Sequence, residues 1–326
     1  MDSIRQAKPL AIVELFGGIG AFRKALLNKA IAHQVVSYVE IDKNCVKSYN
    51  RLYNEYFFPQ SVIDYHLPND RPVDILMHGS PCQDFSRAGI RQGGLEGSGT
   101  RSSLLFETLR VIEEAPFKPQ WVIWENVKGV LDRKLRPAFE AYLEVMSELG
   151  YTTTYSILNS RDFGIPQRRE RLFAVSYLST TNPFDFGNLK RKRSPPLAEF
   201  LEHKTKEKYV VKQPSLLRLF DPTSTYKPGF KKRLRVLKDY CFTICTRPMS
   251  IPNAGFLRLS DGRHRVLTER ECFRLMGFSD GDFDKLLEAF PEKETKMSSI
   301  LYKQAGNSIV VPVLEAILQE ILLDYN

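Results

Sequence analysis

The chain has 326 residues, of which 43% are hydrophobic and 26% are charged, and its 47 Lys and Arg against 38 Asp and Glu give a net charge of +9. The length allows one large domain with a smaller second domain. The excess of basic residues favours binding to a polyanion, with nucleic acid the first candidate. No apolar run approaches the roughly 20 residues that cross a bilayer, and the N-terminus lacks a signal-peptide layout, so we expect a cytoplasmic protein without a membrane partner.

Short apolar runs alternate with amphipathic helical patterns over residues 10–175. In chain order they are AIVELF, FRKALLNKAI, VVSYVEI, CVKSYNRLY, VDILMHG, SLLFETLRVIEE and WVIWENV. Strands rich in Val and Ile that are followed by amphipathic helices are typical of a parallel sheet with crossover helices. The sequence therefore predicts an α/β domain over residues 1–180, with a mostly parallel sheet and helices on both faces.

The pattern changes after the apolar run LFAVSYL, where prolines and basic residues cluster in DFGNLKRKRSPPLAEF. We expect residues 181–300 to form a smaller, irregular domain with short strands and exposed basic loops. The last segment, 301–326, contains SIVVPVLEAILQEILLDY, whose apolar residues recur at helical spacing. Pro312 is compatible with the first turn of that helix, which we expect to pack back against the first domain.

A glycine-rich turn, LFGGIGAFRKAL, follows the first predicted strand. Gly17, Gly18 and Gly20 allow a tight turn and a close approach of a ligand to the helix N-terminus. Arg23 occupies the third glycine position of a dinucleotide fingerprint, which disfavours NAD. Glu40 ends the next predicted strand about 20 residues on, where a carboxylate can accept hydrogen bonds from ribose hydroxyls. The two features predict a nucleoside-containing cofactor, with a purely structural turn as the alternative.

Cys82 lies in HGSPCQDFSRAG, directly after the predicted strand VDILM, at the edge where open α/β sheets bind ligands. It is one of five cysteines, an odd number without the two-residue spacing common among zinc ligands, so we expect neither a disulfide framework nor a metal site. Pro81 stiffens the approach to Cys82, and polar and basic neighbours favour the nucleophilic thiolate. A buried cysteine without a chemical role is the alternative.

Two further motifs place charged side chains at strand ends. Glu125 follows the apolar run WVIW, where it could act chemically or cap a helix. Gln167, Arg169 and Arg171 alternate in FGIPQRRERLF, so an extended backbone puts all three on one face. A solvated strand edge is one reading of this alternation. If the arginines are partly buried, they need acceptors such as phosphates, carboxylates or a base carbonyl.

The motifs in this order resemble the cytosine-C5 DNA methyltransferase family of the bacterial and phage modification type. The matching segments lie within residues 11–175 and 258–323 and are FGGIG, PCQ, ENV, QRRER, LTERECFRLMGF and QAGNS, the last of which could also cap the final helix. The resemblance implies the fold of S-adenosylmethionine-dependent methyltransferases. It also implies an enzyme that methylates C5 of cytosine within a short specific sequence of double-stranded DNA.

The resemblance further implies a mechanism and a role for each catalytic residue. The target cytosine rotates out of the duplex, and Cys82 adds to C6 of its ring. Glu125 hydrogen-bonds or protonates N3, Arg171 holds the O2 carbonyl, and Arg169 steadies the cysteine loop. C5 then takes the methyl group from S-adenosylmethionine, and loss of the C5 proton expels Cys82 without any metal.

The cofactor and DNA contacts that the resemblance implies come from separate parts of the chain. The residues that the resemblance implies around the cofactor are Phe16, Gly18, Gly20, Glu40, Ile41, Asn307 and Ser308, with Pro81 and Leu104 at its methyl end. Asp64 is expected against the adenine amino group, although Ser61 could replace it. Those expected to contact DNA are Gln83, Ser86, Arg87 and Arg101 in a loop that closes over DNA, Gln167, and Thr243 and Ile244 in the target-recognition region 182–256.

Two other functions compete with DNA methylation. A tRNA cytosine-C5 methyltransferase would share these motifs, and the tripeptide Cys241-Phe242-Thr243 supports it, whereas the longer basic middle region and the SPCQ context favour DNA. A catalytically inactive DNA-binding protein of the same fold is disfavoured because Cys82 and Glu125 are both present. We expect the protein to act as a monomer.

Overall fold

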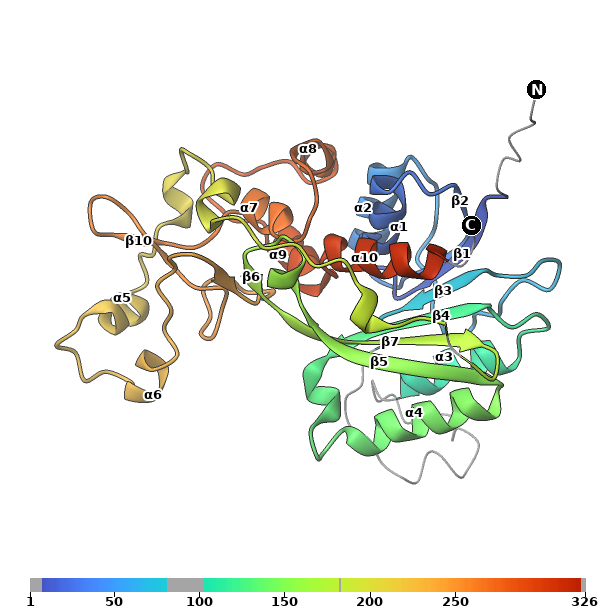
Figure 1. The fold of residues 1–326 in the computed structure, drawn as a ribbon. Helices are drawn as coiled ribbons and strands as arrows, with labels where there is room; N and C mark the ends of the chain where they lie inside the picture. Colours follow the sequence, from blue (N-terminus) through green and yellow to red (C-terminus); the bar gives the residue numbers. More distant parts are fainter. Residues whose placement is uncertain (1–7, 81–102, 182, 324–326) are drawn as a thin grey trace.

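A six-stranded sheet forms the centre of the computed structural model, which describes residues 8–80, 103–181 and 183–323 (Figure 1). The strand order is β2-β1-β3-β4-β7-β5. The strands are β1 (Leu10–Leu15), β2 (His33–Val39), β3 (Ile75–His78), β4 (Trp121–Val127), β5 (Tyr151–Asn159) and β7 (Glu170–Leu178). Adjacent pairs among β1 to β4 are parallel, and β7 runs antiparallel between β4 and β5. The predicted mostly parallel sheet is confirmed, with β5 as a strand that the sequence analysis did not anticipate.

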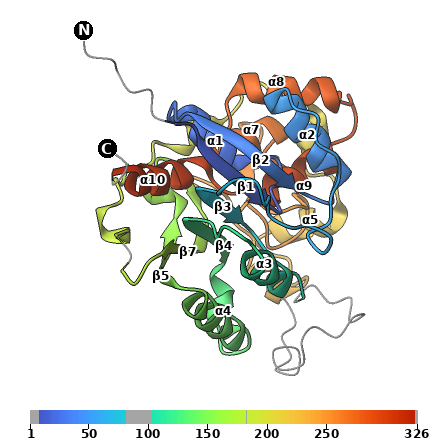
Figure 2. The same ribbon diagram turned by 90° about the vertical axis from the view of Figure 1, so that its right-hand side faces the viewer.

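Helices cover both faces of this sheet (Figure 2). On one face lie α1 (Ala21–Asn28) and α10 (Val311–Leu322), and on the other lie α3 (Ser103–Glu113) and α4 (Arg136–Glu148). Successive strand residues point to opposite faces, so Ile12 and Ile75 pack with α1 and α10, while Val13 and Leu76 pack with α3 and α4. Burial on both faces explains why these strands read as continuous apolar runs.

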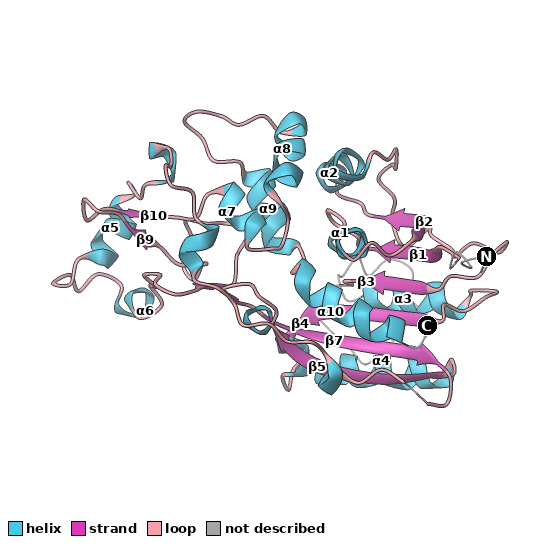
Figure 3. Ribbon diagram, turned by 45° about the horizontal axis from the view of Figure 1, so that its top comes forward, coloured by secondary structure: helices cyan, strands magenta, loops and turns pink. Residues whose placement is uncertain are grey.

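The region after β7 is irregular, as predicted (Figure 3), but only part of it has a core of its own. Its elements are α5 (Pro214–Phe220), α6 (Pro228–Lys231), β8 (Cys241–Phe242), β9 (Leu257–Arg258), β10 (His264–Arg265), α7 (Glu269–Arg274), α8 (Asp280–Ala289) and α9 (Ser299–Asn307), and a two-residue strand, β6 (Gln167–Arg168), pairs with β8. A separate buried cluster contains residues from Tyr209 to Val266. Phe184, Leu197 and Phe273 belong instead to the main core. This separately packed cluster lies within the predicted 181–300, and the bounds of that domain stay a prediction.

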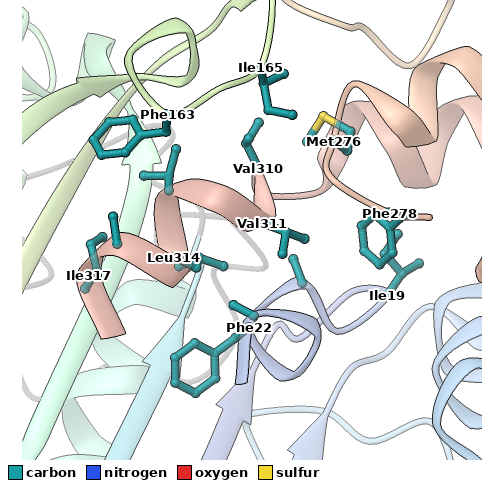
Figure 4. Packing of buried hydrophobic residues seen from close by; sticks show 14 of the residues in the cluster. Ile19, Phe22, Phe163, Ile165, Met276, Phe278, Val310, Val311, Leu314 and Ile317 are labelled. Carbon is teal, nitrogen blue, oxygen red and sulfur yellow. The ribbon is translucent and has the colours of Figure 1, made fainter. Parts of the chain in front are cut away.

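The C-terminal helix α10 packs back onto the first domain, as the sequence predicts. Pro312 lies in the first turn of α10. Elsewhere in the fold, α2 (Lys43–Tyr53) packs next to α8. Figure 4 shows Val311 and Leu314 of α10 on the side of Phe22 of α1 and of Ile19, which lies in the turn before that helix. Among the described residues, the stretch Ser299–Leu322 is long and apolar enough by length and composition to cross a membrane, which the sequence analysis did not anticipate, although 61% of its apolar window is buried inside the protein.

Candidate active site

The glycine-rich turn between β1 and α1 requires the backbone freedom that its glycines supply. Phe16, Gly18 and Gly20 all have positive φ angles, of 55°, 55° and 77°. A Cβ added to Gly20 would lie 2.5 Å from the ring of Tyr53, so Gly20 permits close packing of α2. A Cβ on Gly18 would meet no atom within 4 Å. Gly18 therefore faces open space, whereas Gly20 is needed for packing.

A pocket opens beside this turn and joins motifs from both ends of the chain. Phe16 and Gly18 line it from the turn, Gly79 from the end of β3, and Asn307 and Ser308 from the end of α9. The structure thus brings the first and the last sequence motifs together at one site. Four of the residues expected around the cofactor line this pocket, at the carboxyl edge of the parallel strands where α/β folds bind ligands.

Glu40 lies next to the glycine turn and is held by two backbone groups. The N–H of Gly18 donates to its Oε2 at 3.0 Å, and the N–H of Asp42 donates to its Oε1 at 2.8 Å. Burial raises the pKa of the Glu40 carboxyl. Each oxygen keeps lone pairs for further donors, which suits the predicted ribose contact. Ile41, 72% exposed, follows directly and offers an apolar surface beside it.

The pocket also contains side chains that the sequence analysis missed, namely Glu14, Cys45 and Gln304. Glu14 is buried and accepts a hydrogen bond of 2.7 Å from the hydroxyl of Tyr49, and its burial raises its pKa to about 7. A lone carboxylate inside the apolar run AIVEL was the signal that could have found it. Although Glu14 and Cys45 are potential ligands, no group of three or more His, Cys, Asp or Glu side chains that could hold a metal ion occurs in the described part of the chain.

The two candidates for the adenine contact lie in a loop beside Glu40. The N–H of Gln60 donates to the carbonyl of Glu40 at 2.9 Å, which brings the loop to this edge of the sheet. Asp64 is exposed, whereas the hydroxyl of Ser61 accepts a hydrogen bond from within the loop. Neither residue lines the pocket described above, and Leu104 packs against the α3 and α4 side of the core. These three cofactor contacts stay predictions.

Glu125 and Arg171 form an ion pair next to the pocket. They lie on the neighbouring antiparallel strands β4 and β7, where Glu125 faces Phe173 and Arg171 is its diagonal neighbour. Arg171 Nε lies 3.1 Å from Glu125 Oε1, with side chains that are 16% and 13% exposed. Burial raises the pKa of Glu125, against the opposing effect of Arg171. A Cβ added to Gly79 would lie 3.9 Å from Glu125 Oε2, so Gly79 adjoins both this carboxylate and the pocket.

The residues just before Cys82 are anchored by β4. Asn126 donates to the carbonyl of Ser80 at 3.0 Å, and the Trp124 ring N–H donates to the same carbonyl at 3.4 Å. Burial lowers the pKa of His78 to about 3, and this neutral ring contacts the Ser80 hydroxyl at 3.1 Å. Of the predicted site residues, six lie outside the described part of the chain: Pro81, Cys82, Gln83, Ser86, Arg87 and Arg101.

A family model described as C-5 cytosine-specific DNA methylase matches residues 10–323. The chain belongs to this family. It is therefore a DNA cytosine-C5 methyltransferase, as the order of its motifs predicts, and methyltransferases generally use S-adenosylmethionine.

Individual relatives agree with this family over nearly the whole chain. The type II methyltransferase M2.ScrFI of Lactococcus lactis subsp. cremoris is 31% identical, covering 96% of this chain and 99% of that protein. The type II methyltransferase M.HhaI of Haemophilus parahaemolyticus is 30% identical, covering 96% and 94%. The crystal structure of S. pombe Dnmt2 methyltransferase has a TM-score of 0.75 over 98% of this chain and 100% of that chain. At 19% identity the last likeness concerns the fold alone, and it confirms the predicted methyltransferase fold.

Arg169 of this methyltransferase ties three segments together. Its guanidinium donates to the carbonyls of Ile244 at 3.2 Å, Gly306 at 3.0 Å and Ser308 at 2.8 Å. Burial, together with the charge of Arg171, lowers the pKa of Arg169 to about 9. Within the described residues Arg169 therefore fixes the end of α9, which lines the pocket. Its expected effect on the cysteine loop stays a prediction.

Two of the predicted DNA contacts are not supported by their positions. Gln167 is fully buried, and its amide donates to the carbonyl of Leu275 at 2.9 Å and accepts from the N–H of Ile244 at 3.0 Å. Ile244 is buried as well, in the main core, so neither side chain is exposed to a partner. Thr243 is half-buried, and its hydroxyl donates to the carbonyl of Arg168. Of the expected contacts in the described part, Thr243 alone keeps some exposure to a partner.

Proposed function

We propose that this methyltransferase binds S-adenosylmethionine in the pocket beside the glycine turn and methylates a cytosine flipped out of double-stranded DNA, with Cys82 as the nucleophile. The observation that carries the proposal is the position of Gly79. Gly79 lies three residues before Cys82 in the chain. It lines the pocket, and it also adjoins the carboxylate of Glu125. Methyl donor and target base would therefore meet at one point of the sheet edge.

The pocket suits the cofactor in shape and charge. Gly18 leaves open space for a ligand, and Glu40 has acceptor capacity for ribose hydroxyls beyond its two backbone bonds. Glu14, buried in the pocket wall, offers negative charge toward a cationic ligand when it is ionised. S-adenosylmethionine, when bound, supplies an electrophilic methyl group on its sulfonium.

The catalytic residues would act on the flipped cytosine. The Cys82 thiolate forms a bond to C6, and Glu125 supplies a proton or hydrogen bond at N3, for which its raised pKa is suited. Arg171 would hold the O2 carbonyl and stabilise the negative charge that the addition creates. C5 would then form its bond to the methyl group as the bond from that carbon to the donor sulfur breaks, which leaves the sulfur as a neutral thioether. Removal of the C5 proton returns the electron pair to the ring and breaks the bond from C6 to the Cys82 sulfur.

Double-stranded DNA in the cytoplasm is the proposed target, with the protein acting as a monomer. The net charge of +9 suits contacts to phosphates, which give affinity without sequence information. Both relatives described above, M2.ScrFI at 31% identity and M.HhaI at 30%, are type II methyltransferases of bacteria, which favours DNA over tRNA as the substrate.

The test is methyl transfer from radiolabelled S-adenosylmethionine to duplex DNA and, in parallel, to tRNA. We expect label in DNA only, and bisulfite sequencing of DNA from expressing cells should place it at C5 of cytosine in one short sequence. Cys82→Ser should abolish turnover and leave binding of S-adenosylhomocysteine intact, while Glu125→Gln should lower kcat by about 10² to 10⁴. Turnover by Cys82→Ser would refute the mechanism, and label in tRNA alone would refute the substrate.

A further inference from the structure

A tight turn, Val62–Tyr65, shapes the loop that carries the expected adenine contact. The N–H of Tyr65 donates to the carbonyl of Val62 at 3.2 Å and closes the turn, while both of these side chains are buried in the core next to α3 and α4. Asp64 occupies a central position and is exposed. The turn therefore has fixed ends and presents Asp64 outward.

Arg110, on α3, holds this turn from the core side. Its Nη2 lies 3.2 Å from the carbonyl oxygen of Val62, 3.0 Å from that of Ile63 and 3.1 Å from that of Tyr65. A terminal guanidinium nitrogen carries two N–H bonds, so the three carbonyls share its donors. One cationic group thus gathers three of the turn's carbonyls, which would otherwise repel one another.

Two carboxylates fix the guanidinium itself. Nε donates to Glu107 Oε2 at 2.8 Å, and Nη1 donates to Glu114 Oε2 at 2.7 Å. Glu107 lies one helical turn before Arg110, and Glu114 lies one turn after it. Partly exposed ion pairs of this kind contribute little to stability, but they restrict the side chain to one geometry. The remaining nitrogen, Nη2, is therefore directed at the turn.

We propose that Arg110 is a positioning residue for the cofactor: it sets the Val62–Tyr65 turn so that Asp64 recognises the adenine amino group. This rests on the proposed function, in which the chain binds S-adenosylmethionine with its ribose at Glu40. The backbone bond from Gln60 to Glu40 connects the two parts of that site. Loss of the Arg110 contacts would release the turn and reduce both cofactor affinity and selectivity for adenine.

The test compares Arg110→Met with a matched control, Arg136→Met. Arg136 also pairs with a carboxylate one helical turn away, Glu140 at 3.6 Å, but it is exposed on α4. Calorimetry would measure the Kd of S-adenosylhomocysteine and of S-inosylhomocysteine, which lacks the adenine amino group. Arg110→Met should raise the Kd of S-adenosylhomocysteine by about tenfold and that of S-inosylhomocysteine by far less. Its kcat at saturating cofactor should stay within about threefold of that of the original protein, and Arg136→Met should change neither Kd.

The outcomes separate the two proposals. If the original protein binds S-adenosylhomocysteine but Arg110→Met leaves both Kd values unchanged, or raises them by the same factor, Arg110 does not position the adenine contact. If the original protein binds neither compound, the proposed cofactor site is wrong. Circular dichroism checks the fold of each variant, and Arg110→Gln, with the same expected and refuting results, replaces Arg110→Met if that variant does not fold.

Discussion

Glu14 makes the stability of this methyltransferase dependent on pH in a way that one substitution removes. The carboxyl is buried at the end of β1, and its ordinary pKa of 4.5 rises to about 7 because burial disfavours the charged form more than the Tyr49 hydroxyl and Arg23 favour it. The folded state therefore prefers protonated Glu14. The resulting stabilisation is complete below pH 4.5 and is lost as the pH rises toward 7.

The size of the effect follows from the pKa change. Each pH unit between the unfolded and folded pKa values corresponds to ~1.4 kcal/mol, so the rise from 4.5 to about 7 corresponds to about 3 kcal/mol. Glu14→Gln is neutral at every pH and still offers an oxygen to Tyr49. The free energy of unfolding of this variant minus that of the original protein should therefore increase by about 2 to 3 kcal/mol as the pH rises from about 5 to about 8.

Urea denaturation of both proteins at about pH 5 and pH 8 measures this gain, because other titrating groups cancel in the difference between variant and original. Glu140→Gln, at an exposed position on α4, serves as the control and should show no such gain. A difference between Glu14→Gln and the original that is equal at both pH values would refute the reasoning. Since Glu14 lines the pocket, the same variant should also bind S-adenosylmethionine more weakly relative to the uncharged S-adenosylhomocysteine.

Two further substitutions test the packing around the site. Asn126→Ala removes the 3.0 Å bond to the carbonyl of Ser80, and kcat should fall by about ten- to a hundredfold because the segment before the nucleophile loses its anchor. The Kd of S-adenosylhomocysteine should be unchanged, and an unaltered kcat would contradict the anchoring role. Gly306→Ala places a Cβ 2.7 Å from the backbone nitrogen of Thr246 and should lower the free energy of unfolding by about 1–3 kcal/mol. Gly229→Ala, where a Cβ meets nothing within 4 Å, should change it by less than about 1 kcal/mol, and equal effects in urea denaturation would contradict the steric explanation.

The fold class and the location of the site follow from local sequence patterns. Apolar runs that alternate with helical periodicity specify strands and helices because burial on both faces of a sheet demands them. Gly18 and Glu40 were found in the same way, since each stands at the end of a predicted strand, where a parallel sheet exposes its carboxyl edge. Helix α10 was readable from its spacing and from the position of Pro312. What these features share is that neighbours along the chain determine them.

Contacts between distant segments decided the rest. Alternation predicted that Gln167, Arg169 and Arg171 share a face. It did not predict that Ile244 and the ends of α7 and α9 bond to Gln167 and Arg169, while Arg171 pairs with Glu125. Ile244 and Ser308, which contact Arg169 through their carbonyls, lie 75 and 139 residues away from it in the chain. A periodic pattern specifies which side chains point the same way, whereas their burial depends on which remote segment packs there. The sequence by itself therefore determined the methyltransferase and its motifs, and only the tertiary structure decided which of those side chains face a ligand and which hold the protein together.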